Sequence, residues 1–213
     1  GFELPSEKVN LVPNGIDIGQ WLSPTPQPQG GREPLVVAWG RIQYEKGFQV
    51  LTRAIGHLRH RIPDIRCVIA GRGTYLAELQ TQIDMEGVGD LVQLAGFVPD
   101  DELRRLLQRT SCVVIPSLYE PFGIVALEGM AAGAPTIVAR TGGLAEIIEG
   151  TGAGVLFEPG NHIALASCIA DVLGHPEVAD GMRTKAASLL ASRYTWDAIA
   201  AATLGVYRKA KRG

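Results

Sequence analysis

The sequence predicts an α/β fold built on a doubly wound parallel sheet. From residue 35 onward, short apolar runs alternate with longer segments in which apolar residues recur at helical spacing. The connections between them are short, and the runs are apolar at successive positions, as in strands that are buried on both faces. Strands that alternate with helices in this way pair in parallel through right-handed crossovers, with helices on both faces of the sheet.

The first predicted strand is LVVAW at residues 35–39, which ends at Gly40. The second, IRCVIA, ends at Gly71, and the fourth, CVVIP, ends at a proline. Glycine and proline at these places mark the ends of strands. The other predicted strands follow the same pattern and lie at residues 65–70, 91–95, 112–116 and 136–139, with a weaker one at 154–157.

Helices are predicted between the strands because apolar residues recur there every three or four positions. The first such stripe comprises Phe48, Leu51, Ile55 and Leu58. Asp100 or Asp101 is available as the N-cap of a later helix. Helices are predicted at residues 47–61, 75–86, 100–108, 123–132 and 144–149, and three more follow the last strand at 162–174, 177–191 and 196–211.

The composition excludes several classes of protein. The chain has 213 residues, a formal charge of 20 − 22 = −2 and 46% hydrophobic residues, enough to fill a core. No apolar run is long enough to span a bilayer, no signal-peptide pattern opens the sequence, and the charge gives no reason to expect a nucleic-acid partner. Cys67, Cys112 and Cys168 lack metal-ligand spacing, so we expect reduced thiols and a cytoplasmic location.

The chain divides into an entry segment and a domain. Residues 1–34 contain a short apolar stretch at 9–12, a PNGID turn, and a polar, proline-rich loop at 23–31. Residues 35–213 contain all the predicted strands and form one Rossmann-like domain, extended at its end by helices. Ligands of such sheets bind at the carboxyl ends of the strands, so the loops after the strands are the candidate site.

The loop after the first strand carries two cations, Arg41 and Lys46, between Gly40 and the start of a helix. Positive charge and hydrogen-bond donors at this place suit a phosphate group, although solvated surface charges are the alternative. The loop is neither a P-loop nor a dinucleotide fingerprint. Gly71, after the second strand, permits a tight turn or a close approach of a ligand to the backbone.

The segment EPFGIVALEGMAAGAP after the fourth strand is the strongest candidate. Glu120 lies in the loop, and the first N–H groups of the helix, from Phe122 through Gly123 to Ile124, are available to sugar oxygens or an anion. Glu128 follows within the helix, where its carboxylate can accept two hydrogen bonds from a vicinal diol. The alternative is that Glu120 is only a surface acid and Glu128 only an exposed helix position. The neighbours of Glu128 are apolar, however, so a charge there without a partner would be costly if it is buried.

These blocks resemble the C-terminal, donor-binding domain of retaining glycosyltransferases of the GT-B fold, above all the large family 4 group. EPFGIVALEGMAAGAP matches the Glu-x7-Glu signature of that family, and VPNGID, GRIQYEKG, LAGFVPDDEL and TGGLAEII match its other blocks in order. The resemblance extends from about Val9 to the end of the chain. It implies a single GT-B half-domain with extra C-terminal helices.

The resemblance also implies a role for each site residue. Arg41 and Lys46 would hold the diphosphate of the donor, Glu128 the ribose hydroxyls, and Glu120 the transferred sugar. Of these, Glu120, Arg41 and Lys46 would be catalytic. The remaining residues implied to bind substrate, with Phe97 and Val98 beside the nucleobase, are Gly40, Gly71, Phe97, Val98, Phe122, Gly123 and Ile124.

The implied reaction transfers a hexose, with retention of anomeric configuration, from a donor such as UDP-, GDP- or ADP-hexose and without a metal. The acceptor would be bound by a missing N-terminal domain, so we expect donor binding and little transfer by this chain, and membrane association only in a full-length enzyme. The alternatives are a nucleotide-sugar-binding subunit of a two-chain transferase, a GT-B sugar-nucleotide epimerase, and, last, an NAD-binding module. Trp39 is expected to lie in the core rather than to stack on a base, and Trp196 to pack the last helix rather than bind a ligand.

Overall fold

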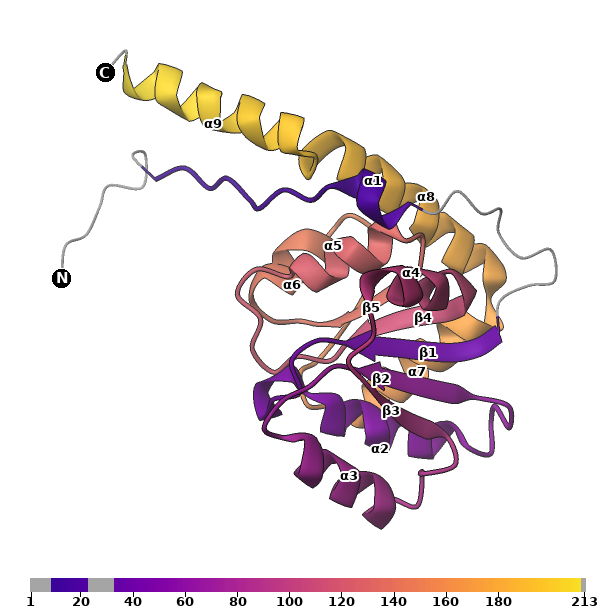
Figure 1. The fold of residues 1–213 in the computed structure, drawn as a ribbon. Helices are drawn as coiled ribbons and strands as arrows, with labels where there is room; N and C mark the ends of the chain where they lie inside the picture. Colours follow the sequence, from indigo (N-terminus) through magenta and orange to yellow (C-terminus); the bar gives the residue numbers. More distant parts are fainter. Residues whose placement is uncertain (1–8, 23–32, 212–213) are drawn as a thin grey trace.

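The fold was examined in a computed structural model that describes residues 9–22 and 33–211 (Figure 1). The predicted proline-rich loop at 23–31 lies outside the described residues. Within them, six strands form one parallel sheet in the order β3-β2-β1-β4-β5-β6, which is the doubly wound order. The predicted fold class is therefore confirmed. The strands are β1 (Glu33–Trp39), β2 (Arg66–Ala70), β3 (Val92–Gly96), β4 (Thr110–Ile115), β5 (Thr136–Ala139) and β6 (Val155–Phe157).

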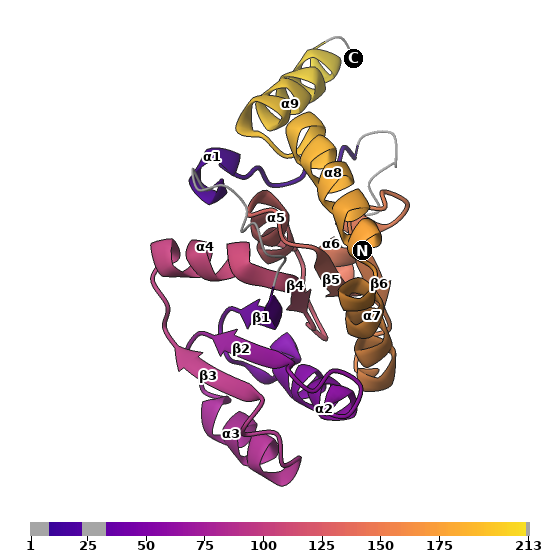
Figure 2. The ribbon, with the colours of Figure 1, turned by 90° about the vertical axis from the view of Figure 1, so that its right-hand side faces the viewer.

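Helices cover both faces of the sheet, as Figure 2 shows. Those on one face are α2 (Phe48–Leu58), α3 (Leu76–Met85) and α7 (His162–Gly174). Those on the other are α4 (Asp100–Arg109), α5 (Ile124–Ala131) and α6 (Gly142–Ile148), with the short α1 (Ile18–Trp21), whereas α8 (Pro176–Arg193) contributes to the core on both sides. The remaining helical segments are the 3-10 turn η2 (Tyr44–Lys46) and the last helix, α9 (Trp196–Ala210).

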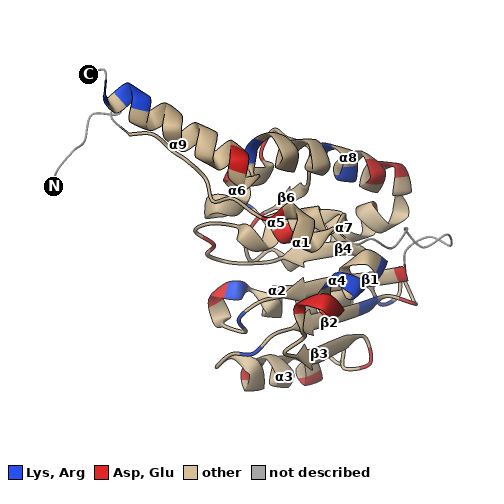
Figure 3. Ribbon diagram, turned by 45° about the horizontal axis from the view of Figure 1, so that its top comes forward, with Lys and Arg blue, Asp and Glu red and all other residues tan. Residues whose placement is uncertain are grey.

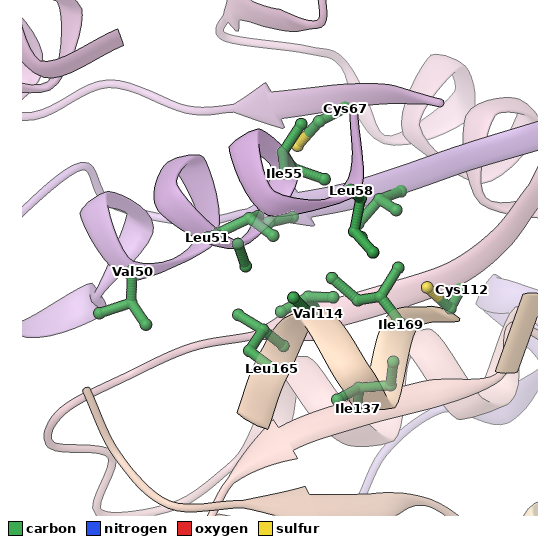
Figure 4. Packing of buried hydrophobic residues seen from close by; sticks show 14 of the residues in the cluster. Val50, Leu51, Ile55, Leu58, Cys67, Cys112, Val114, Ile137, Leu165 and Ile169 are labelled. Carbon is green, nitrogen blue, oxygen red and sulfur yellow. The ribbon is translucent and has the colours of Figure 1, made fainter. Parts of the chain in front are cut away.

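The alternation of side chains along β1 divides the core in two. Val36 packs with the α2 and α7 side, whereas Leu35 and Val37 pack with α4 and α5. Figure 4 shows residues of the first cluster, to which α2 contributes Ile55 and Leu58 and α7 contributes Leu165 and Ile169. Both faces are thus closed by apolar packing, and the open region is left at the strand ends.

The predicted buried thiols are confirmed. Cys67 of β2 and Cys112 of β4 stand on either side of Val36, are buried and are free. Burial raises the pKa of Cys112 to about 12, so this thiol stays protonated at neutral pH. These cysteines serve as small core residues.

The helices differ from the prediction at several ends, among them that of α2, which stops at Leu58 rather than at residue 61. Pro99, rather than Asp100 or Asp101, is the N-cap of α4, so both acids lie in its first turn, where they still interact favourably with the helix dipole. Helix α6 begins two residues earlier than expected because Gly142, with a φ of 44°, starts the turn. Helix α1 was not predicted, since its four residues are too few for a periodic pattern.

The entry segment and α9 leave the compact body together (Figure 1). The backbone N–H of Ile16 donates to the carbonyl of Tyr194 at 2.8 Å, and Gly15 lies directly beneath the indole of Trp196. No residue of α9 is buried. Trp196 packs the start of this last helix against Gly15, as expected, although 60% of its surface is exposed.

Candidate functional site

Two hollows open at the carboxyl ends of the central strands, and they share Trp39, Gly40 and Arg41. We call them the Lys46 hollow, of about 210 Å³, and the Phe97 hollow, of about 330 Å³. The other residues that line the Lys46 hollow are Lys46, Phe48, Val114, Ile115, Pro116, Ser117, Glu120 and Val125. Those that line the Phe97 hollow are Ala70, Gly71, Arg72, Phe97, Val98, Asp100 and Leu103.

The loop that carries Lys46 is fastened to the loop after β4. Gly47 ends the η2 turn with a φ of 70°, and a Cβ there would lie 1.9 Å from the carbonyl oxygen of Pro116. The N–H groups of Leu118 and Tyr119 both donate to the carbonyl of Glu45, at 2.8 and 3.3 Å. Because only glycine permits this approach and this backbone conformation, Gly47 determines where Lys46 stands.

This fastening brings the side chains of Lys46 and Glu120 into contact. The Nζ of Lys46 lies 2.6 Å from Oε2 of Glu120, and only 7% of Glu120 is exposed. The sequence predicted that both residues belong to one site but not that they form an ion pair. A buried carboxylate needs such a partner, because removing it from water is otherwise costly.

The turn at Gly142 and Gly143 holds Glu120 from its other side. The N–H of Gly143 donates to the carbonyl of Glu120 at 2.9 Å, and a Cβ on Gly142 would lie 2.3 Å from that same oxygen. The two glycines of the TGG sequence therefore let the loop after β5 press against the Glu120 loop. The motif was visible in the sequence, but its contact with Glu120 was not.

The backbone donors before α5 are only partly free. Gly123 is the N-cap in a left-handed conformation, and its N–H donates to Oε1 of Glu120 at 3.4 Å. The expectation that this N–H has no partner in the chain is therefore wrong, because Glu120 bends back to receive it. Among the described residues, the N–H groups of Phe122 and Ile124 have no hydrogen-bond acceptor.

The floor between the two hollows is formed by the ends of β1, β2 and β3, which are linked by backbone hydrogen bonds. Gly40 donates to the carbonyl of Ala70 at 3.0 Å, and Gly71 donates to that of Gly96 at 2.6 Å. A Cβ on Gly71 would lie 1.8 Å from the oxygen of Gly40, whereas one on Gly40 would meet open space. Gly71 is thus required for the packing of two loops, besides lining the Phe97 hollow.

One side of the Phe97 hollow is formed by a charged side chain, Arg72, and an aromatic ring, Phe97. The guanidinium of Arg72 lies 5.5 Å from the centroid of the Phe97 ring, and 63% of Phe97 is exposed. Val98 and Asp100 complete this side. Sequence reasoning placed Phe97 and Val98 here but missed Arg72 and Asp100, although both adjoin residues that it singled out.

Glu128 lies in α5 outside the lining of both hollows, and it reaches the site through Trp39. The indole Nε1–H of Trp39 donates to Oε2 of Glu128 at 3.2 Å. Burial raises the pKa of Glu128, the negative charge of Asp100 raises it further, and the hydrogen bond from Trp39 opposes both. Trp39 itself is only half-buried and borders both hollows, whereas the sequence suggested a core position.

Two further features concern metals and membranes. In the described ranges, no group of three or more His, Cys, Asp or Glu side chains is placed to hold a metal ion. His57 and His162 contact each other at 2.9 Å between α2 and α7, away from the lining of either hollow. None of the helices in residues 9–22 and 33–211 combines the length and apolar character needed to cross a bilayer.

Sequence comparison finds relatives over nearly the whole chain. The profile described as "Glycosyl transferases group 1" matches residues 21–189. Glycogen synthase of Mycobacterium tuberculosis is 36% identical over 97% of this chain and 50% of its own length. D-inositol 3-phosphate glycosyltransferase of Xylanimonas cellulosilytica is 32% identical over 97% of this chain and 52% of its own. The chain spans about half the length of the curated relatives that it matches.

Solved structures have the same fold. HepE of Anabaena, in complex with UDP, matches 96% of this chain and 57% of its own with a TM-score of 0.81 at 23% identity. Sucrose-phosphate synthase of Thermosynechococcus elongatus matches 95% of this chain and 53% of its own, with a TM-score of 0.79 at 26% identity. The structural matches show which fold the sheet belongs to, and the profile, which covers most of the domain, shows the family. The chain belongs to the glycosyl transferases group 1 family and has the fold of a GT-B half-domain.

Proposed function

We propose that this chain binds the nucleotide-sugar donor of a retaining hexosyltransferase at the carboxyl edge of its sheet. Group 1 glycosyltransferases use nucleotide-sugar donors, and a structural neighbour was solved with UDP-glucose. The observation that carries the proposal is the meeting of Arg41, Lys46 and Glu120 in one hollow at the strand ends. Two cations and a carboxylate suit the two parts of the donor that change charge during transfer.

The charges have distinct tasks in this proposal. When the bond from the anomeric carbon to the diphosphate breaks, negative charge grows on the departing phosphate, and Arg41 and Lys46 stabilise it. Positive charge grows on the sugar at the same time. Glu120, which pairs with Lys46 at 2.6 Å, positions the sugar hydroxyls once Lys46 turns toward phosphate. The unpaired N–H groups of Phe122 and Ile124 offer further hydrogen bonds there.

The second hollow suits the nucleoside. Phe97 and Val98 border a space into which a base fits, with Arg72 beside the Phe97 ring. Glu128 then receives the ribose hydroxyls, because it accepts a hydrogen bond from Trp39, a residue that lines both hollows. The donor would therefore lie across the shared floor at Gly40, with its diphosphate toward Lys46.

Isothermal titration calorimetry tests this proposal directly. The chain is titrated with UDP, GDP and ADP, with their hexose conjugates, and with NAD. We expect one nucleoside diphosphate to bind, and its affinity to be the same in EDTA as in MgCl2, because the binding groups are cations and backbone amides. Failure of all three diphosphates to bind would overturn the proposal, and selective binding of NAD would replace it.

We further propose that residues 35–213 form the donor-binding domain and that transfer needs an acceptor-binding domain from outside this chain. The curated relatives are about twice as long as the part that the chain matches. The C-terminal domain of a group 1 family protein from Francisella tularensis, solved as a separate chain, is covered completely by this one, with a TM-score of 0.72. That match supports independent folding of a domain of this size.

A further inference from the structure

Trp39 is the last residue of β1 and, together with Gly40 and Arg41, lines both hollows. We propose that Trp39 is a positioning residue, whose indole N–H aims the carboxylate of Glu128 at the ribose hydroxyls of the donor. The inference rests on the proposed function, which gives the ribose to Glu128, and it adds a residue that the sequence suggested was core. It is carried by the seating of the indole, its hydrogen bond and its place between the hollows.

The indole is held at both of its ends. At the far end of the ring, a Cβ on Gly129 would lie 3.3 Å from Cη2, so the bare glycine of α5 leaves room for the ring. At the pyrrole side, Nε1 donates to Oε2 of Glu128 at 3.2 Å. Because Gly129 directly follows Glu128 in α5, one helix both seats the ring and receives its hydrogen bond.

This hydrogen bond favours the charged form of Glu128, which the rest of its surroundings disfavour. Burial and the charge of Asp100, at the start of α4, both raise the pKa of Glu128, and the Trp39 N–H lowers it. A ribose diol offers two O–H donors, which require the ionised carboxylate as a double acceptor. Trp39 occupies one acceptor position on Oε2 and leaves Oε1 and the rest of Oε2 for the diol.

The position of Trp39 fits the chemistry of a nucleoside diphosphate. The ribose of such a ligand joins the base to the phosphates, so its hydroxyls must lie between the two binding regions. Trp39 borders the Lys46 hollow on one side and the Phe97 hollow on the other. Its hydrogen bond to Trp39 therefore holds Glu128 where the ribose would lie, between the base and the phosphates.

The decisive experiment removes the N–H and keeps the ring. Trp39 is replaced by phenylalanine and, in a second variant, by 3-benzothienylalanine, which preserves the shape of the indole but has no donor. Each variant is titrated with the nucleoside diphosphate that the wild-type chain binds best and with its 2′,3′-dideoxy form. Trp196→Phe, on the exposed surface of α9, is the matched control.

We expect both Trp39 variants to bind the ribonucleotide about tenfold more weakly, which corresponds to about 1.4 kcal/mol, and to bind the dideoxy form as the wild type does. The pH at which ribonucleotide binding reaches half its maximum should move upward, because Glu128 loses the contact that favours its charge. In a Glu128→Gln background, the Trp39 variants should have no further effect.

Two results separate failure of this inference from failure of the proposed function. If no nucleoside diphosphate binds the wild-type chain, the proposed function fails first. If the wild type binds and the benzothienyl variant loses affinity equally for the ribo and dideoxy forms, or not at all, Trp39 is only a wall of the site and the inference is wrong. Thermal unfolding of each variant shows whether it is folded, and the benzothienyl side chain fills the same space as the indole.

Discussion

Lys46 and Glu120 form an ion pair in which their charges neutralise each other. At 2.6 Å, with side chains that are 18% and 9% exposed, the pair is held where water screens it weakly. In the proposed function, the Lys46 ammonium exchanges this carboxylate for a phosphate of the donor. The same proposal makes Glu120 available to the sugar in that step, so that one ion pair supplies a group to each side of the bond that breaks.

Replacing Lys46 with methionine should weaken diphosphate binding far more than nucleoside binding. A hydrogen bond to a charged group contributes about 1.5–3 kcal/mol, so we expect a loss of about 10- to 100-fold for the diphosphate. The free nucleoside should bind almost as before. Calorimetry with both ligands measures this, with Lys209→Met on the exposed end of α9 as control. Equal losses for both ligands would contradict a diphosphate role.

The same substitution should destabilise the fold, because Glu120 remains buried without its partner. We expect the free energy of unfolding to fall by about 1–3 kcal/mol in urea titrations. Adding Glu120→Gln should restore most of that stability, since the uncharged amide tolerates burial, yet it should not restore binding. If the double variant were as unstable as the single one, the ion pair would not be the cause.

Glu128→Gln should make the chain more stable at neutral pH while weakening nucleotide binding. Burial and Asp100 raise the folded-state pKa of Glu128 above its unfolded value, so the charged form is disfavoured in the fold. That cost is fully present above the folded-state pKa and disappears as the pH falls through the unfolded one. Melting temperatures of both proteins should therefore converge on acidification. A constant difference across the pH range would exclude this electrostatic cause.

At the scale of loops and helices, glycines determine how closely the site loops approach. Gly47 and Gly87 have similar left-handed conformations, with φ of 70° and 63°, but only Gly47 faces a backbone carbonyl at 1.9 Å. Gly87→Ala should cost about 1–2 kcal/mol for the conformation alone. Gly47→Ala should cost clearly more and also weaken nucleotide binding, because it displaces Lys46. Urea unfolding and calorimetry compare the two variants, and equal stability losses would refute the role of Gly47 in the contact between the two loops.

The elements of the sheet were predictable, and some of the site contacts were not. Periodicity identified β1 to β6 because buried parallel strands are apolar throughout, whereas α1 depends on packing of Ile18 and Trp21 against the core. Strand alternation contained one overlooked signal. Trp39 lies two residues after Val37, so both side chains point to the same face of the sheet, the face that α5 covers. The alternation along β1 therefore placed Trp39 near Glu128 of α5 once that face was known. The pairing of Lys46 with Glu120 depended on how closely two loops approach.

At the scale of the whole molecule, α9 stands apart from the core. Its charges lie at its ends, Asp197 in the first turn and Arg208 and Lys209 in the last, as Figure 3 shows. This arrangement complements the helix dipole. Between them lie apolar side chains such as Leu204 and Tyr207, which are 51% and 66% exposed.

Removing α9 should therefore change the stability of the domain little. A chain that ends at Thr195 keeps both core clusters, since neither contains a residue of α9. We expect its melting temperature to lie within about 4 °C of the intact chain, equivalent to roughly 1 kcal/mol for a domain of this size. A chain that also lacks α8 should unfold, because it loses Met182 and Leu190 from the core. A large drop on removing α9 alone would show that it supports the fold.

The chain should bind a donor yet transfer little sugar by itself. All the groups that we assign to the donor come from one sheet edge, whereas the proposed acceptor domain would approach that edge from outside. Release of nucleoside diphosphate from the bound hexose donor should therefore be slow for this chain. It should rise when the chain is fused to the half of Mycobacterium tuberculosis glycogen synthase that lies outside the match. The Lys46→Met fusion is the control, because it keeps the acceptor half and lacks the proposed phosphate contact. Rapid transfer to a sugar acceptor by the chain alone would contradict the need for a second domain.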